Sequence, residues 1–198
     1  MWGLTVPTGS VVDLAAARAA LRAAGEVDPH TTTVLAAAAL LEVVAMVLGA
    51  DPRALAPAAR GEVSPATGPG ASVLDVGAGT GILAALARRA GARRAVGIER
   101  EVALVDEGRR RHPGVTLLVG DAIEGLPTGR FHIVVANLPA PTVERLVPAL
   151  VAAASDALVV TGVRLVQGPA LRRALERSGL RDIRASAASG WCAYRALV

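Results

Sequence analysis

The spacing of hydrophobic positions changes near Ala71. From there on, short runs rich in valine, leucine and isoleucine alternate with longer segments whose apolar residues recur every three or four positions. The short runs span 72–76, 94–99, 115–120, 131–137 and 157–162. The helical segments span about 80–90, 101–111, 142–153 and 169–178. Strands that alternate with helices of this length predict βαβ units and a parallel sheet that is buried on both faces.

The end of the chain breaks this alternation. Two strand candidates, 180–189 and 190–198, follow one another across a glycine turn with no helical segment between them. Such a pair predicts an antiparallel hairpin that closes one side of the sheet. We therefore predict an α/β fold: a Rossmann-like, seven-stranded, mostly parallel sheet with helices on both faces and a C-terminal antiparallel hairpin.

The first sixty residues have a helical pattern throughout. Helices are expected over 11–24, 33–48 and 53–60, and the segment GEVSPATGPG at 61–70 has the composition of a linker. This predicts a helical cap over residues 1–60, a linker over 61–70 and the α/β domain over 71–198.

Composition narrows the class of protein. All 21 basic residues are arginines and lysine is absent, which fits a GC-rich coding bias or, alternatively, selection for arginine as a phosphate binder. The single cysteine, Cys192, excludes an internal disulfide, and the three scattered histidines give no metal-ligand cluster.

The N-terminus lacks the pattern of a secretory signal. The most apolar segment, 33–49, is expected to be too short and too weakly apolar to span a membrane, so we expect a soluble, cytoplasmic protein without a membrane partner.

The segment VLDVGAGTGIL at 73–83 carries the candidate chemistry. Three alternating glycines follow the first predicted strand of the α/β domain, where ligands bind in open α/β sheets. A dinucleotide fingerprint would need a third glycine at Ile82, and a phosphate loop would need a lysine. The remaining pattern is D-x-G-x-G-x-G, with a carboxylate at Asp75.

This pattern resembles the first motif of the class I S-adenosylmethionine-dependent methyltransferases. The resemblance implies that Asp75 lies near the cationic ammonium group of S-adenosyl-L-methionine, and that Glu99 accepts hydrogen bonds from both ribose hydroxyls. It also implies that Asp121 meets the adenine amine and the Ala122 N–H an adenine ring nitrogen. The implied cofactor-binding set is Thr32, Thr33, Asp75, Val76, Gly77, Ala78, Gly79, Gly81, Glu99, Arg100, Asp121, Ala122 and Asn137, and the product is S-adenosyl-L-homocysteine.

The segment FHIVVANLPA at 131–140 points to a subfamily. It lacks the aromatic residue expected for methylation of a flat base, and Glu144 is the only acid near it, which disfavours a protein arginine methyltransferase. The chain from His132 to Leu150 instead resembles the bacterial methyltransferases of large-subunit ribosomal protein eleven. LVVTGVRLVQ at 158–167, GWCAYRALV at 190–198 and HTTT at 30–33 are similar to elements of that family, whose threonines lie near the methionine end of the cofactor. The resemblance covers about 28–40 and 71–198.

The resemblance implies direct displacement at a sulfonium methyl group. The side-chain oxygen of Asn137 and the carbonyl of Leu138 are then the expected catalytic groups, because both can accept hydrogens from an amine and aim its lone pair. His132 is expected to be structural and deep in the sheet, Cys192 to lie in the core, and His30 is an alternative proton acceptor at the site mouth. Residues 28–40 are expected to fold over the cofactor as a lid.

The substrate stays open at this stage. Family members carry an additional N-terminal domain that grips the ribosomal protein, and 29 residues precede His30 here. We expect methyl transfer to an amine nitrogen of a protein or peptide. The alternatives are a small-molecule biosynthetic enzyme that uses S-adenosylmethionine, and a binding domain without catalysis. The sequence disfavours a nucleic-acid partner and contains no signal for the oligomeric state.

Overall fold

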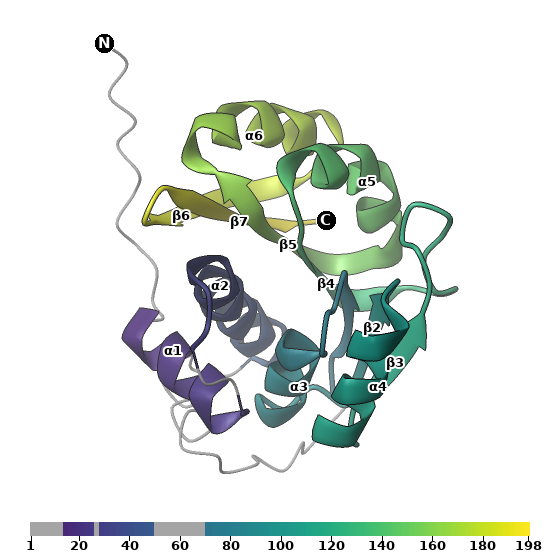
Figure 1. The fold of residues 1–198 in the computed structure, drawn as a ribbon. Coiled ribbons are helices and arrows are strands. Elements are labelled where there is room, and N and C mark those ends of the chain that lie inside the picture. The colour runs from purple at the N-terminus through teal and green to yellow at the C-terminus, as the bar shows by residue number, and fades with distance from the viewer. Residues whose placement is uncertain (1–13, 26–27, 50–69) are drawn as a thin grey trace.

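The computed structural model describes residues 14–25, 28–49 and 70–198 (Figure 1). A seven-stranded sheet runs through it in the order β3-β2-β1-β4-β5-β7-β6. The strands are β1 (Ser72–Val76), β2 (Arg94–Glu99), β3 (Thr116–Val119), β4 (Phe131–Asn137), β5 (Ala154–Arg164), β6 (Arg181–Ala188) and β7 (Trp191–Leu197). All the strand runs expected from the sequence are therefore present.

The strand directions confirm the predicted fold class. β1 pairs in parallel with β2 and β4, β2 with β3, and β4 with β5, whereas β7 runs antiparallel to both β5 and β6. The strand order reverses between β1 and β4, because the connections from these two strands lead to opposite sides of the sheet. In open α/β sheets, the carboxyl ends of the strands at such a reversal form a binding crevice.

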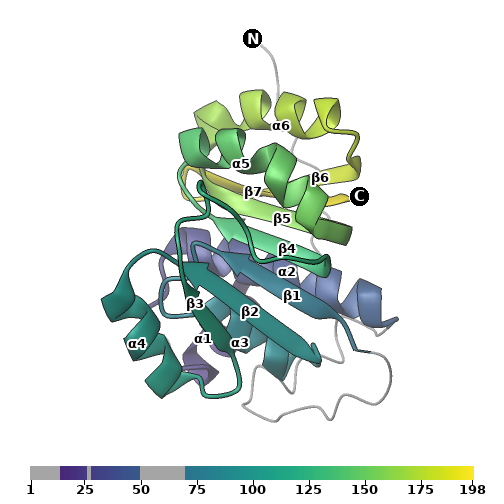
Figure 2. The same cartoon turned by 90° about the vertical axis from the view of Figure 1, so that its right-hand side faces the viewer.

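Helices cover both faces of the sheet (Figure 2). They are α1 (Leu14–Ala23), α2 (Thr31–Leu48), α3 (Ile82–Arg89), α4 (Val102–Arg111), α5 (Ala140–Ala153) and α6 (Gly168–Arg177), with a short 3-10 turn, η3, at Leu165–Gln167. One apolar core joins α1, α2 and α3 to the sheet, and a second joins α5 and α6 to the opposite face. A smaller cluster packs α4 against the β2–β3 side.

Helix α2 is part of the core. It begins after the N-cap residue His30 and ends at Gly49, which adopts the left-handed conformation. By length and composition it could cross a membrane, which corrects the expectation that this segment is too short and too weakly apolar. However, 72% of the helix is buried within the structure, against β4, β5 and β7 and the neighbouring helices α1 and α3. A helix that is apolar on all sides suits this position, since it is enclosed by other elements.

Two boundaries differ from the sequence expectation. Strand β5 begins three residues earlier and ends two residues later than the predicted 157–162, because it pairs with β4 at its start and with β7 at its end. The predicted helix over 53–60, the start of the helix at 11–24 and most of the linker at 61–70 lie outside the described residues. The division into cap, linker and catalytic domain stays a prediction.

Candidate active site

The three loop glycines have different surroundings. Gly77, Gly79 and Gly81 all lie in the left-handed region, with φ of +71°, +56° and +80°. A Cβ on Gly77 would lie 2.4 Å from the Leu138 side chain, and a Cβ on Gly81 would lie 2.9 Å from Leu117. A Cβ on Gly79 would meet no atom within 4 Å. The first and third glycines are therefore required by close packing, whereas the second leaves backbone facing open space that a ligand can occupy.

Asp75 is a buried carboxylate with one unused oxygen. Its Oδ2 accepts a hydrogen bond from the Ala84 N–H at 3.2 Å, but its Oδ1 is buried and has no hydrogen-bond partner among the described residues. Burial raises the pKa of Asp75 to about 7; the Ala84 hydrogen bond opposes this shift, and the nearby charge of Glu99 adds to it. An unsatisfied buried acceptor is costly, so this position is suited to a donor or cation supplied from outside the chain.

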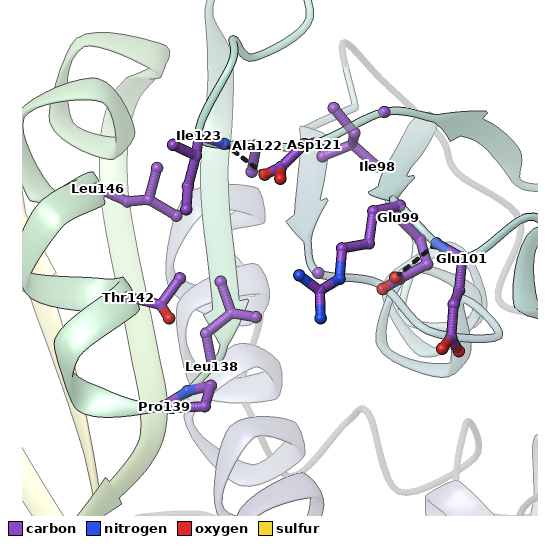
Figure 3. Close-up of a pocket in the computed structure, with 13 residues that line it drawn as sticks. Ile98, Glu99, Glu101, Asp121, Ala122, Ile123, Leu138, Pro139, Thr142 and Leu146 are labelled. Carbon is purple, nitrogen blue, oxygen red and sulfur yellow. Dashed lines mark hydrogen bonds between the residues drawn. The ribbon is translucent and has the colours of Figure 1, made fainter.

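Glu99 is held in place at the end of β2. Its Oε2 accepts from the Gly79 N–H at 3.0 Å. Its Oε1 accepts from the Glu101 N–H, also at 3.0 Å (Figure 3). Each carboxylate oxygen can accept a second hydrogen bond, so the side chain can still receive two hydroxyl donors. This geometry suits the predicted ribose contact.

A cavity of about 340 Å³ opens beside these groups. Figure 3 shows Leu138, Thr142 and Leu146 on one side of it and Glu99 and Glu101 on the other. Its remaining lining residues are Gly77, Ile98, Arg100, Gly120, Asp121, Ala122, Ile123 and Pro139. This combination of apolar walls and a few polar groups is typical of a pocket for a small molecule.

Only some of the predicted cofactor residues line that cavity. Those that do are Gly77, Glu99, Arg100, Asp121 and Ala122, together with the predicted catalytic Leu138. Asp121 is oriented by its Oδ1, which accepts from the Ile123 N–H at 2.8 Å. Val76 is buried in the core. Ala78 donates its N–H to the Ile98 carbonyl at 3.0 Å, which fixes the start of the loop. The apolar walls Ile98, Ile123 and Leu146 were not predicted, and their only sequence signal is their position beside strand ends and in a helix.

Asn137 and Thr33 meet although 104 residues separate them. Asn137 Nδ2 donates to Thr33 Oγ1 at 3.4 Å, so the end of β4 contacts the first turn of α2. The next residue, Leu138, packs its backbone against Gly162 of β5, where a Cβ would lie 2.5 Å from the Leu138 carbonyl oxygen. Gly162 was missed by the sequence analysis, since only the three-dimensional approach of the two backbones shows why it must be glycine.

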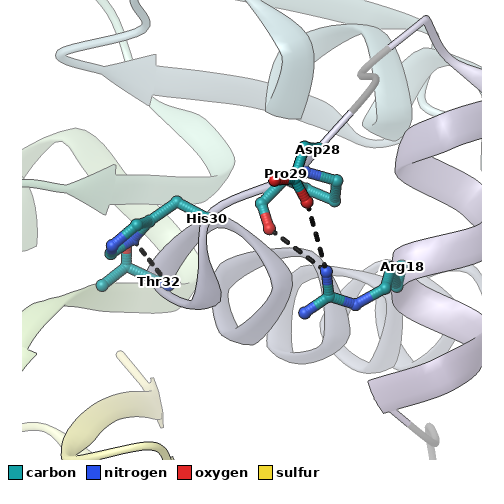
Figure 4. A network of polar contacts seen from close by, with 5 residues as sticks. All are labelled: Arg18, Asp28, Pro29, His30 and Thr32. Carbon is teal, nitrogen blue, oxygen red and sulfur yellow. Dashed lines mark hydrogen bonds and ion pairs between the residues drawn. The ribbon is translucent and has the colours of Figure 1, made fainter.

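The start of α2 is tied to its neighbours (Figure 4). His30 Nδ1 accepts from the Thr32 N–H at 3.3 Å and lies 3.0 Å from Thr32 Oγ1, so His30 acts as a helix cap. Arg18 of α1 reaches the Pro29 carbonyl at 3.4 Å and the Asp28 carboxylate at 4.0 Å. The buried hydroxyl of Thr32 and the partly buried Thr33 are thereby fixed at the carboxyl edge of the sheet.

Two other predicted positions are placed as follows. His132 is exposed rather than deep in the sheet, and its Nδ1 accepts from the Ser72 N–H at 3.1 Å at the opposite end of the strands. Its role in linking β4 to β1 is nonetheless structural. Cys192 is buried in the core. In the described ranges, no group of three or more histidine, cysteine or acidic residues could hold a metal ion.

The glycine loop after β1, the acidic residues that follow β2 and β3, and the seven-stranded sheet together define the fold of class I S-adenosylmethionine-dependent methyltransferases. The model of the family "Ribosomal protein L11 methyltransferase (PrmA)" matches residues 29–197. The chain therefore belongs to the PrmA family, which confirms the resemblance drawn from its motifs.

Individual relatives show the extent of this similarity. The ribosomal protein L11 methyltransferase of Myxococcus xanthus is 34% identical over 126 residues, which cover 62% of this chain and 44% of that protein. The chain thus spans less than half the length of this relative. The crystal structure of the ribosomal protein L11 methylase from Lactobacillus delbrueckii subsp. bulgaricus has a TM-score of 0.66 at 21% identity, covering 85% of this chain and 79% of that one. Magnesium protoporphyrin IX methyltransferase from Synechocystis, solved with bound S-adenosylhomocysteine, has a TM-score of 0.56 at 15% identity over 89% of this chain and 91% of that one. Both structures share the fold.

Proposed function

We propose that this chain is an S-adenosylmethionine-dependent methyltransferase that acts on an amine nitrogen of a protein or peptide. Its family relatives make ribosomal protein L11 the first substrate to test, and such a substrate implies action in the cytoplasm. The observation that carries the proposal is the arrangement around Gly79. Open space faces this residue, Glu99 accepts its N–H, and the unpaired buried Oδ1 of Asp75 lies in the strand that leads into the loop.

Different site residues would bind different parts of the cofactor. Glu99, already oriented by two backbone N–H groups, would receive the ribose hydroxyls. Asp121 and Ala122 would hold the adenine ring in the cavity, with apolar walls on either side. Asp75 would balance the ammonium group, and the first turn of α2, with Thr32 and Thr33, would face the methionine end. When bound, the cofactor supplies an electrophilic methyl group on a sulfonium.

Asn137 would position the acceptor. Because its Nδ2 is directed at the Thr33 hydroxyl, its Oδ1 is left to accept an N–H from an incoming amine. An amine held this way can aim its lone pair at the methyl group, which is the main requirement of a direct displacement. The Leu138 backbone packs on Gly162, and this contact fixes the turn that carries Asn137 out of the sheet.

Transfer of labelled methyl from S-adenosylmethionine tests the proposal. Purified ribosomal protein L11 and short peptides with free amines serve as acceptors. We expect Asn137→Ala to lower single-turnover transfer by roughly a hundredfold or more with nearly unchanged cofactor affinity, since the lost contact is made with the acceptor. Thr116→Ala, an exposed position on the edge strand β3, is the control and should transfer at the wild-type rate. Equal rates for wild type and Asn137→Ala would contradict the amine-positioning role and direct attention to His30.

A further inference from the structure

A cation that has no carboxylate partner among the described residues lies near the predicted acceptor position. Arg164 ends β5 and pairs in register with Trp191, the first residue of β7. The guanidinium carbon of Arg164 lies 4.5 Å from the centre of the Trp191 ring. Within the described part of the chain, none of the ion pairs includes Arg164. The aromatic face holds the guanidinium in position while its N–H groups remain available to an anion.

This pair lies on the same side of the site as Asn137. Trp191 also packs edge-on against His30, the cap of α2, with ring centres 5.6 Å apart. Asn137 contacts Thr33 in the first turn of the same helix. Along β5, Arg164 lies three residues beyond Thr161, the register partner of Asn137, which corresponds to at most about 10 Å because the strand is irregular between Val160 and Val163.

An apolar surface adjoins the cation and is held rigidly. Val166 in the η3 turn is 89% exposed, and its neighbour Leu165 is 41% exposed. The turn is fixed at two points, since the Arg164 N–H donates to Gln167 Oε1 at 3.1 Å and the Leu165 N–H donates to the Gly190 carbonyl at 2.9 Å. Tryptophan and arginine are enriched among the residues that contribute most to protein–protein binding, and the exposed aliphatic side chain beside this pair adds apolar area for a partner to cover.

We propose that Arg164, Trp191 and Val166 form a docking surface for the methyl-acceptor substrate, which is an acidic peptide segment. Its carboxylate pairs with the Arg164 guanidinium and a neighbouring aliphatic side chain covers Val166. The acceptor amine then lies about 10 Å away, at Asn137, a distance that about three extended residues span. A planar guanidinium can hold a carboxylate through two parallel hydrogen bonds, which gives direction as well as affinity. This inference rests on the proposed function and names the substrate class of the same site.

Fluorescence of Trp191 reports on this surface directly. The chain has two tryptophans, so Trp2→Phe leaves Trp191 as the only one. Two matched probes with free amino termini, Ala-Leu-Glu amide and Ala-Leu-Gln amide, are titrated into this protein in the presence of S-adenosylhomocysteine. We expect the acidic peptide to bind at least tenfold more tightly. Arg164→Gln should abolish the difference, Val166→Ser should weaken both peptides a few-fold, and Arg173→Gln on the exposed face of α6 should change nothing.

Several results would overturn the inference. The first three are equal affinity for the two peptides, a preference for the acidic peptide that persists in Arg164→Gln, and no binding of the acidic peptide. The fourth is binding of glutarate as tight as that of the acidic peptide, which would indicate a small acid as the ligand. Calorimetry with S-adenosylhomocysteine separates this failure from that of the proposed function. Normal cofactor binding without peptide discrimination contradicts only the docking surface, whereas peptide discrimination without cofactor binding contradicts only the methyltransferase proposal.

Discussion

Close packing requires Gly77 and Gly81 in the loop after β1, whereas Gly79 is the one whose missing side chain leaves room for a ligand. We predict that Gly79→Val loses cofactor binding while the chain still folds, because the new side chain would fill that space. Gly129→Val is the matched control, since Gly129 also has a positive φ, of +96°, and no atom within 4 Å of a Cβ. Both variants bear a similar backbone strain of about 1–3 kcal/mol. Calorimetry with S-adenosylhomocysteine should separate them, and equal loss of binding would show that strain alone explains the effect.

The raised pKa of Asp75 predicts that both protein stability and cofactor affinity depend on pH. Burial raises the pKa of Asp75 to about 7. Between about pH 4 and pH 7, Asp75 is therefore protonated in the folded state but ionised in the unfolded chain. Stability without ligand should therefore fall as the pH rises through this window, and level off above pH 7. Cofactor affinity should change in the opposite direction, since only the ionised carboxylate attracts an ammonium group.

Asp75→Asn tests this opposition. The variant should be more stable than wild type to urea at pH 7.5 without ligand, should bind cofactor more weakly, and should lose the pH dependence of affinity between pH 6 and 7.5. If wild type and Asp75→Asn showed the same pH profile for both stability and cofactor binding, the protonation of Asp75 would not control either property.

The residues that could be predicted are those with a local signal. Asp75 and Glu99 lie near the carboxyl ends of their strands, and Asp121 follows the end of β3. The alternation of strands and helices was therefore enough to predict that all three lie at one edge of the sheet. Gly162 and the Arg164–Trp191 pair could not be found this way. Their reasons lie in contacts between distant segments, and a glycine or arginine at a strand end has no distinctive local pattern.

At the scale of elements, α2 connects the site to the core. Its first turn carries Thr33 to Asn137, and farther along Glu42 forms a largely buried ion pair with Arg195 of β7, with Oε2 and Nε 2.9 Å apart. Removing one partner of a buried pair takes compensating charge away from the other, at a cost of up to about 3–5 kcal/mol. We predict this loss in the free energy of unfolding for Arg195→Met. The exposed pair Arg172–Glu176 on α6 is the control, and Arg172→Met should cost less than about 1 kcal/mol.

Urea titrations of the two variants and of the double variant Glu42→Leu/Arg195→Met measure these effects. The double variant should recover much of the loss, because two apolar side chains replace the pair without leaving a charge. If Arg195→Met proved as mild as Arg172→Met, α2 would not depend on this contact.

Element boundaries were predictable where pairing is simple. The runs at 72–76, 94–99 and 131–137 match their strands, since each is flanked on both sides by parallel partners and reads as a continuous apolar run. β5 was predicted too short because its ends carry the polar residues Ser155, Asp156 and Arg164. Arg164 pairs with Trp191, whereas Ser155 and Asp156 lie where the register with β4 shifts. The packing of α2 across the sheet likewise depends on contacts from β4, β5 and β7 that no window along the chain contains.

At the scale of the whole molecule, the reversal of strand order between β1 and β4 brings the site together. The glycine loop follows β1, Glu99 ends β2, Asp121 follows β3 and Asn137 ends β4, and these strands run in parallel, so all four arrive at one edge. α2 packs against one face of the sheet and α5 against the other (Figure 1), and the first turn of α2 contacts Asn137 through Thr33. The fold thus places Glu99 and Asp121, which line the cavity, at the same edge of the sheet as Asn137.

Calorimetric titration of the full chain with S-adenosylmethionine, S-adenosylhomocysteine and NAD tests the central claim most directly. We predict a single site of micromolar affinity for the first two ligands and no heat with NAD. Glu99→Ala should weaken binding by one to two orders of magnitude, about 1.5–3 kcal/mol for the lost charge-assisted hydrogen bonds, whereas Glu124→Ala, at an exposed position, should bind as wild type does. Tight binding of NAD together with no heat from S-adenosylmethionine would contradict the account.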